Sequence, residues 1–200
     1  MRPDSPLKTG KDMVDRLKAD PASLSVALAA ARGNAFHLAT AMIAKSAGVD
    51  IRKLKIVVFN SSADGLTAAL GGHVDILAGT AGSTRALLEA GKIRVLGVAA
   101  KERLAGAFAT VPTWREQGVN AVMDLSRGVL GARGLTPAQI QYWDAVFERM
   151  TRTEEWRKDL EKNLWVDAYL NSEATRRAWK EQYDVLKALL IELGMVKGSS

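Results

Sequence analysis

The sequence predicts an α/β fold with a parallel-rich sheet. Three short apolar runs are rich in β-branched side chains and too short for lone helices: residues 54–59, 74–77 and 93–100. The segments between these runs suit helices, and Gly71, Gly72 and Gly91 stand where a helix C-terminus needs a positive φ. The order strand, helix, strand, helix, strand favours parallel pairing through right-handed crossovers.

The first hundred residues alternate helices and strands. Apolar spacing predicts a first helix over residues 7–19, which Pro21 breaks. A strand is expected at residues 24–28, and a helix follows over residues 35–47 after a loop of small residues. The sheet is therefore predicted to lie within residues 22–100, with four strands that alternate with helices.

The chain changes character near residue 120, where charged helical segments replace small-residue α/β sequence. Thr113 and Glu116 have the spacing of a capping box, which begins a short helix. Two weak strands are expected at residues 121–123 and 128–131. Apolar spacing then predicts three helices: one with Pro137 at its first position, one over residues 154–163, and a long last one capped by Ser172.

Four of the five tryptophans lie in these late amphipathic segments. Their helical spacing predicts that they are core residues: Trp143, Trp156, Trp165 and Trp179. The last helix carries an apolar stripe formed by Trp179, Tyr183, Leu186, Leu190 and Leu193. We expect this stripe to pack against further secondary structure.

The composition argues against several classes of protein. The chain has 28 Lys and Arg against 22 Asp and Glu, a formal net charge of +6, but its bases are interleaved with acids. This pattern favours a solvated basic surface over a nucleic-acid partner. The lack of cysteine excludes disulfides and thiolate metal sites. No apolar run approaches a membrane span, and no apolar segment typical of a signal peptide follows the polar residues 1–6.

Catalytic motifs find little support. His37 and His73 lack metal-ligand spacing, and the place of His37 early in a helix favours a structural role. Ser61, Ser62 and Ser83 stand in no G-x-S-x-G elbow, and residues 79–82 lack the P-loop pattern. The sequence therefore predicts no enzyme, no cofactor and no metal site.

Three polar loops, each between a predicted strand and a predicted helix, are the best candidates for a binding site. Their candidate residues are Gly33, Asn34, Ser61, Ser62, Asp64 and Thr80. Such loops gather at the C-terminal edge of a parallel sheet, where N–H groups, hydroxyls and helix dipoles favour an anion. The alternative is that each residue only caps its own helix, and Asp64 at a helix start is more typical of a dipole-stabilising residue.

Arg127 is a separate candidate. It lies between two weak predicted strands, where the chain changes character. Its guanidinium would suit a bidentate contact with a carboxylate, and a surface salt bridge is an equally good interpretation.

Several sequence blocks, in their order and spacing, resemble the extracytoplasmic solute-binding proteins of tripartite tricarboxylate transporters. The blocks are residues 70–76, 87–96, 111–118, 126–129, 155–165 and 167–170. The resemblance extends over about residues 5–196. It implies a two-lobed, periplasmic-binding-protein-like fold of type II and a periplasmic location. It also implies that a small organic carboxylate, in this branch possibly a tricarboxylate, is bound and delivered to membrane permease subunits.

The resemblance also assigns regions of the chain. Residues 1–120 correspond to the complete second lobe and residues 121–197 to the C-terminal part of the first lobe, with residues 198–200 as a tail. Most of the first lobe of a family member has no counterpart here. With one cleft wall absent, we expect millimolar or weaker carboxylate binding, and self-association through the exposed lobe surface.

Two loops match the family residue by residue. Gly33 and Asn34 fall on its Gly-Ser/Thr loop, and residues 60–64 fall on its Lys-Gly-Gly loop. Asn60 stands where lysine is commoner, which keeps hydrogen-bond donors but removes a positive charge.

Two other functions remain open. A ligand-sensing domain of a transcription regulator shares this kind of fold, but it should carry a helix-turn-helix, which we do not find. A serine hydrolase would use Ser61 or Ser62 as its nucleophile.

Overall fold

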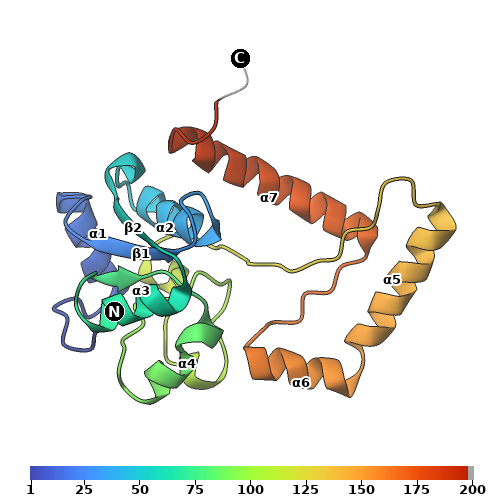
Figure 1. Ribbon diagram of the computed structural model, residues 1–200, viewed down its shortest axis with the longest axis horizontal. Helices are drawn as coiled ribbons and strands as arrows, with labels where there is room; N and C mark the ends of the chain where they lie inside the picture. Colours follow the sequence, from blue (N-terminus) through green and yellow to red (C-terminus); the bar gives the residue numbers. More distant parts are fainter. Residues whose placement is uncertain (198–200) are drawn as a thin grey trace. The chain divides into compact units, whose positions relative to one another are not determined.

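The computed structural model describes residues 1–197, so the expected tail at residues 198–200 lies outside the described residues. The strands are β1 (Ser25–Ala29), β2 (Lys55–Phe59) and β3 (Ile76–Leu77). The helices are α1 (Gly10–Ala19), α2 (Ala35–Ser46), α3 (Ser62–Leu70), α4 (Ala81–Glu89), α5 (Pro137–Thr151), α6 (Glu154–Asn163) and α7 (Ser172–Glu192) (Figure 1). Short 3₁₀ helices are η1 (Ile51–Lys53), η2 (Gly106–Phe108) and η3 (Arg115–Gln117).

The chain divides into two compact units. Unit 1 comprises Met1–Asp124 together with the residues from Lys187 onward, and unit 2 comprises Leu125–Leu186. Helix α7 therefore begins in unit 2 and ends in unit 1. Among the described helices, none combines the length and the apolar character that a membrane span requires.

The sheet of unit 1 has the strand order β2-β1-β3, and both pairings are parallel. Val26 of β1 is in register with Ile56 on one side and Ile76 on the other. The chain moves outward from β1 to β2, then back past β1 to β3. Because both crossovers are right-handed, α2 and α3 lie on opposite faces of the sheet (Figure 1). The predicted α/β class with a parallel sheet is confirmed.

The core of unit 1 is centred on β1. Val26, Ala27 and Leu28 are almost fully buried, and alternate residues of the strand face opposite sides. Ala27 faces α3, where a Cβ added at Gly65 would lie 3.2 Å from Leu77 Cδ1 and 3.7 Å from the Ala27 Cβ. Small residues therefore let α3 approach the sheet closely, which fixes where its N-terminus lies.

The predicted strand at residues 93–100 is wrong. This segment forms a single isolated bridge, between Val98 and Thr113, outside the named strands. Its backbone groups bond to other loops: the Val98 N–H donates to Pro112 O at 3.1 Å, and Ala99 O accepts from the Met123 N–H at 2.8 Å. A β-branched run favours an extended backbone, but the available partner decides whether a sheet forms.

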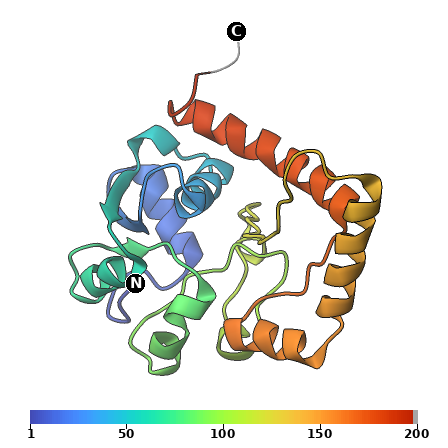
Figure 2. The same cartoon turned by 45° about the vertical axis from the view of Figure 1, so that its right-hand side comes forward.

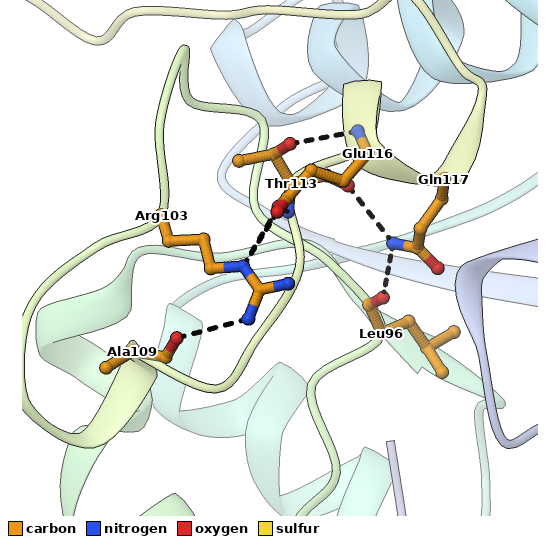
Figure 3. A network of polar contacts seen from close by, with 6 residues as sticks. All are labelled: Leu96, Arg103, Ala109, Thr113, Glu116 and Gln117. Carbon is orange, nitrogen blue, oxygen red and sulfur yellow. Dashed lines mark hydrogen bonds and ion pairs between the residues drawn. The ribbon is translucent and has the colours of Figure 1, made fainter.

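A polar network supports this segment (Figure 3). The predicted capping interaction is confirmed, because the Thr113 N–H donates to Glu116 Oε2 at 2.7 Å and the Glu116 N–H donates to Thr113 Oγ1 at 3.1 Å. Arg103 Nε donates to both Glu116 carboxylate oxygens, at 2.9 and 3.1 Å. Gln117 Nε2 donates to Leu96 O at 2.9 Å, which ties the 3₁₀ turn to the extended segment.

Unit 2 contains the predicted late helices but no buried residue. Figure 2 shows α5 and α6 as separate rods that meet at a tight corner. Neither of the two predicted weak strands forms in the described part of the chain: residues 121–123 belong to unit 1 and residues 128–131 to unit 2. Val129 and Leu130 are 71% and 80% exposed. Ser172 is the first residue of α7 and not its cap, since Asn171 Oδ1 accepts the Ala174 N–H at 2.9 Å.

The prediction that the late tryptophans form a core is also wrong. Trp143 is 49% exposed and Trp165 is 39% exposed, whereas the buried tryptophan is Trp114 of unit 1. Amphipathic spacing identifies the apolar face of a helix. Whether another layer covers that face depends on the rest of the fold, which helical spacing does not report.

Candidate functional site

Three loops lie at the carboxyl-terminal edge of the sheet in unit 1. The loop after β1 ends at Asn34, the loop after β2 ends at Ser61 and the loop after β3 ends at Thr80, and each of these residues caps the next helix. Because the three strands are parallel neighbours, their loops share one edge, as in other parallel α/β sheets that bind ligands.

The first loop is held by His37. The Gly33 N–H donates to His37 Nδ1 at 2.9 Å, and the His37 N–H donates to Asn34 Oδ1 at 3.0 Å. Asn34 Nδ2 also donates to Ala29 O at 2.6 Å. The polar groups of Gly33 and Asn34 are therefore engaged within the loop, and the two residues shape the helix start.

The second loop offers one free hydroxyl. Ser61 Oγ accepts the Asp64 N–H at 3.1 Å and donates to Asp64 Oδ2 at 2.8 Å, so both side chains serve the cap of α3. Ser62, by contrast, is the first residue of α3, and its side chain has no hydrogen-bond partner among the described residues. Its hydroxyl is thus a side-chain donor of this loop that is available to a ligand, as is the amide of the exposed Asn60.

The third loop repeats the capping pattern. Thr80 Oγ1 accepts the Ser83 N–H at 3.3 Å and lies 3.1 Å from Ser83 Oγ, to which it donates. Thr84 Oγ1 donates back to Thr80 O at 3.1 Å. These bonds keep Thr80 at the start of α4 and engage its hydroxyl locally.

The main chain supplies the remaining donors. In each helix the N–H groups of the first two residues have no carbonyl partner within the helix, while the capping side chain accepts from the third. The six residues concerned are Ala35, Phe36, Ser62, Ala63, Ala81 and Gly82. Three helix N-termini also carry partial positive charge, so this edge suits an anion such as a carboxylate.

The electrostatics of the first loop depend on Arg32 and His37. Arg32 Nη2 donates to Ile56 O at 3.1 Å, which holds the guanidinium alongside strand β2. His37 is 3% exposed, and burial, followed by the charge of Arg32, lowers the pKa of its imidazole below the ordinary value of 6.5. The ring is therefore neutral near pH 7, with Nδ1 available as an acceptor.

Arg127 belongs to unit 2 and lies apart from these loops in the chain. Its guanidinium carbon is 4.0 Å from the centroid of the Trp165 ring, a cation–π contact within that unit. The contact differs from the surface salt bridge that the sequence suggested as one interpretation, because the partner is an aromatic ring and not a carboxylate.

Within the part of the chain that the structure describes, neither Ser61 nor Ser62 is hydrogen-bonded to a histidine side chain, as a serine nucleophile would be. Ser61 bonds to a carboxylate, and His37 Nδ1 is engaged by a backbone N–H. Throughout residues 1–197, no cluster of three or more His, Cys, Asp and Glu residues is able to hold a metal ion. The site as built is a set of hydrogen-bond donors.

Sequence reasoning missed the contact between His37 and Gly33. A lone histidine shows no ligand spacing, and we assigned His37 only a general structural role. The available signal was its position four residues after a glycine, at the third position of a helix, where a side chain folds back over the preceding turn.

The chain is similar to known proteins along almost its whole length. A curated relative, the UPF0065 protein in the gbd 5′ region of Cupriavidus necator, is 27% identical over 194 residues, which cover 97% of this chain and 58% of the relative. A solved TctC solute binding protein from Polaromonas is 24% identical with a TM-score of 0.80, and the match covers 96% of this chain and 65% of that one. R. palustris Rpa4515, solved with adipate, is 20% identical with a TM-score of 0.74, covering 96% and 63%.

This chain therefore spans 58 to 65% of the length of these three relatives. The solved structures show that the fold is shared. The family described as Tripartite tricarboxylate transporter family receptor, TctC, matches residues 1–195. The chain belongs to the TctC family of tripartite tricarboxylate transporter receptors.

Proposed function

We propose that this chain is the solute-recognition part of a TctC receptor and binds a small organic carboxylate. The observation that carries the proposal is the meeting of three helix N-termini, those of α2, α3 and α4, at one edge of three parallel strands. The bound adipate of Rpa4515 supports a carboxylate as the ligand class. Tricarboxylates belong to the same class and differ by one further charged group.

Neutral donors carry most of this recognition. Arg32 is the one cationic side chain in the loops at residues 30–34, 60–61 and 78–80, and one of its nitrogens is engaged by Ile56 O. Backbone N–H groups and hydroxyls bind a carboxylate without a full ion pair, which suits reversible binding. We expect affinity in the millimolar range, about 4 kcal/mol of binding free energy, because most of these donors carry no full charge.

The proposed ligand-binding residues keep distinct roles. Those of unit 1 are Gly33, Asn34, Ser61, Ser62, Asp64 and Thr80. Ser62 offers its hydroxyl and backbone N–H directly, while the others hold the loops that present main-chain donors. Arg127 of unit 2 is a separate proposed carboxylate-binding residue, whose guanidinium faces the Trp165 ring.

The proposal extends to the lobes, location and partners. We assign residues 1–120 to the second lobe and residues 121–197 to the returning part of the first. We also propose a periplasmic location and delivery of the carboxylate to membrane permease subunits, and membership of the family supports both. Self-association is expected because unit 2 has no buried residue and exposes apolar side chains that include Leu130.

Calorimetry with adipate tests this function, with its uncharged diamide as the ligand control. Ala35 is the first residue of α2, and Ala35→Asp places a carboxylate where it favours the helix but repels an anionic ligand. Ala138→Asp makes the same change near the N-terminus of α5, outside the proposed site. We expect Ala35→Asp to abolish the heat of adipate binding and Ala138→Asp to retain it. Equal binding by both variants would contradict the proposal.

A further inference from the structure

His37 contacts two consecutive loop residues by different groups. Its imidazole Nδ1 accepts the Gly33 N–H at 2.9 Å, and its own N–H donates to Asn34 Oδ1 at 3.0 Å. A ring nitrogen that accepts a hydrogen bond carries no proton, so the proton of the neutral ring lies on Nε2. The side chain is buried, which leaves the ring little freedom to turn.

Gly33 has a conformation that needs such support. Its φ of +84° lies in the left-handed region. A Cβ at this position would meet Met195 Cε at 3.1 Å and Leu190 Cδ2 at 3.6 Å, so the last turn of α7 and the residues just after it lie against the loop. His37 therefore fixes the Gly33 N–H on one side while apolar atoms close the other, and the backbone enters α2 in one direction.

The surroundings of the ring disfavour a second proton. His37 lines a cavity of about 70 Å³ with Arg32, Arg52 and apolar side chains that include Leu193 and Met195. Both charged groups that line this cavity are cationic. Arg52 is held in place by its hydrogen bond from Nε to Glu192 O. Protonation at Nδ1 would remove the acceptor of the Gly33 N–H and add a third positive charge.

We propose that His37 is a positioning residue for the carboxylate site: its neutral Nδ1 holds Gly33 and Asn34 so that the free N–H groups at the start of α2 face the ligand. The inference rests on the proposed function for its ligand. The loop restraint itself is independent of ligand and is measured without it. Acidification releases the Gly33 N–H and weakens carboxylate binding.

Two substitutions separate the acceptor from the bulk of the ring. His37→Asn places an amide oxygen near the position of Nδ1, whereas His37→Leu fills similar space without an acceptor. NMR of the ligand-free full chain measures exchange of the Gly33 amide proton. We expect exchange at least tenfold faster in His37→Leu and within about threefold of the original chain in His37→Asn. In the original chain the Gly33 amide shift should titrate together with the His37 ring, with a midpoint below 6.5.

Adipate affinity across about pH 5 to 8 gives the second readout. The original chain should bind more weakly as pH falls, His37→Leu should bind weakly at every pH, and His37→Asn should bind with a flatter profile. Equal Gly33 exchange in all three proteins, or equal loss in the Leu and Asn variants, would overturn the role of His37. If adipate fails to bind the original chain while Gly33 still follows His37, the carboxylate function fails and the positioning of the loop stands.

Discussion

The Asp75 carboxylate accepts two hydrogen bonds from Ser25, one from its N–H at 2.7 Å and one from its hydroxyl at 2.6 Å. The two residues directly precede Val26 and Ile76, which are register partners of β1 and β3. Because β3 has only two residues, this side-chain contact extends the pairing of the two strands. It thereby helps to place the loop that follows β3.

Asp75→Ala should lower the free energy of unfolding by about 1–3 kcal/mol, because the buried Ser25 N–H loses its acceptor. Asp75→Asn keeps one carbonyl oxygen and should lose less. Urea unfolding of the two variants measures the difference. An Ala variant as stable as the original chain would show that the contact does not hold the strands together.

Gly33→Ala should destabilise the protein more than Gly48→Ala. Both glycines have positive φ, +84° and +80°, so each alanine carries a backbone cost of about 1–2 kcal/mol. At Gly48 nothing lies within 4 Å of an added Cβ, whereas at Gly33 it would meet Met195 at 3.1 Å. Urea unfolding measures both, and equal losses would mean that Met195 does not close over the loop.

The free energy of unfolding should fall at acidic pH, because protonation of Glu116 removes its contribution to stability. The hydrogen bond from the Thr113 N–H lowers the pKa of Glu116 most, Arg103 acts in the same direction, and desolvation opposes them. A carboxyl group whose pKa is lower in the folded state stabilises it above the unfolded value of 4.5, and that contribution is lost as pH falls through the folded pKa. Glu116→Gln should flatten the unfolding profile below pH 4.5. An unchanged acid limb in this variant would refute the assignment.

Leu130→Glu should reduce self-association. Leu130 is 80% exposed in unit 2, which has no buried residue, so a new charge there opposes apolar contacts between copies. Leu70→Glu, at a 37% exposed position of unit 1, is the matched control. Light scattering should give a mass above 21.6 kDa for the original chain and a lower mass for Leu130→Glu alone. A 21.6 kDa monomer at high concentration would contradict this expectation.

Local signals in the sequence were read correctly where they involve neighbouring residues. The Thr113–Glu116 capping box and the start of α5 behind Thr136 both follow from side-chain spacing within one turn. Residues 93–100 and the exposed Trp143 were misjudged because their structure depends on distant partners. Periodicity reports which face is apolar and leaves open what covers it.

In the candidate site, too, local features were predictable from the sequence and tertiary contacts were not. The loops at Asn34, Ser61 and Thr80 were predictable because each capping residue lies in a short polar loop between a strand and the next helix. The engagement of the Gly33 N–H by His37 was not, because it depends on burial of the ring and on its orientation. Tertiary packing, including Met195 against Gly33, gives that contact its geometry.

Carboxylate recognition by three helix N-termini is tested most directly by an NMR titration of the isotopically labelled chain with adipate. We predict saturable shifts of the amides of Ala35, Phe36, Ser62, Ala63, Ala81 and Gly82, with a dissociation constant in the millimolar range, about 4 kcal/mol. The Ala35→Asp variant should lose these shifts. Saturable shifts confined to other amides, or none at adipate concentrations far above that range, would contradict recognition by these helix starts.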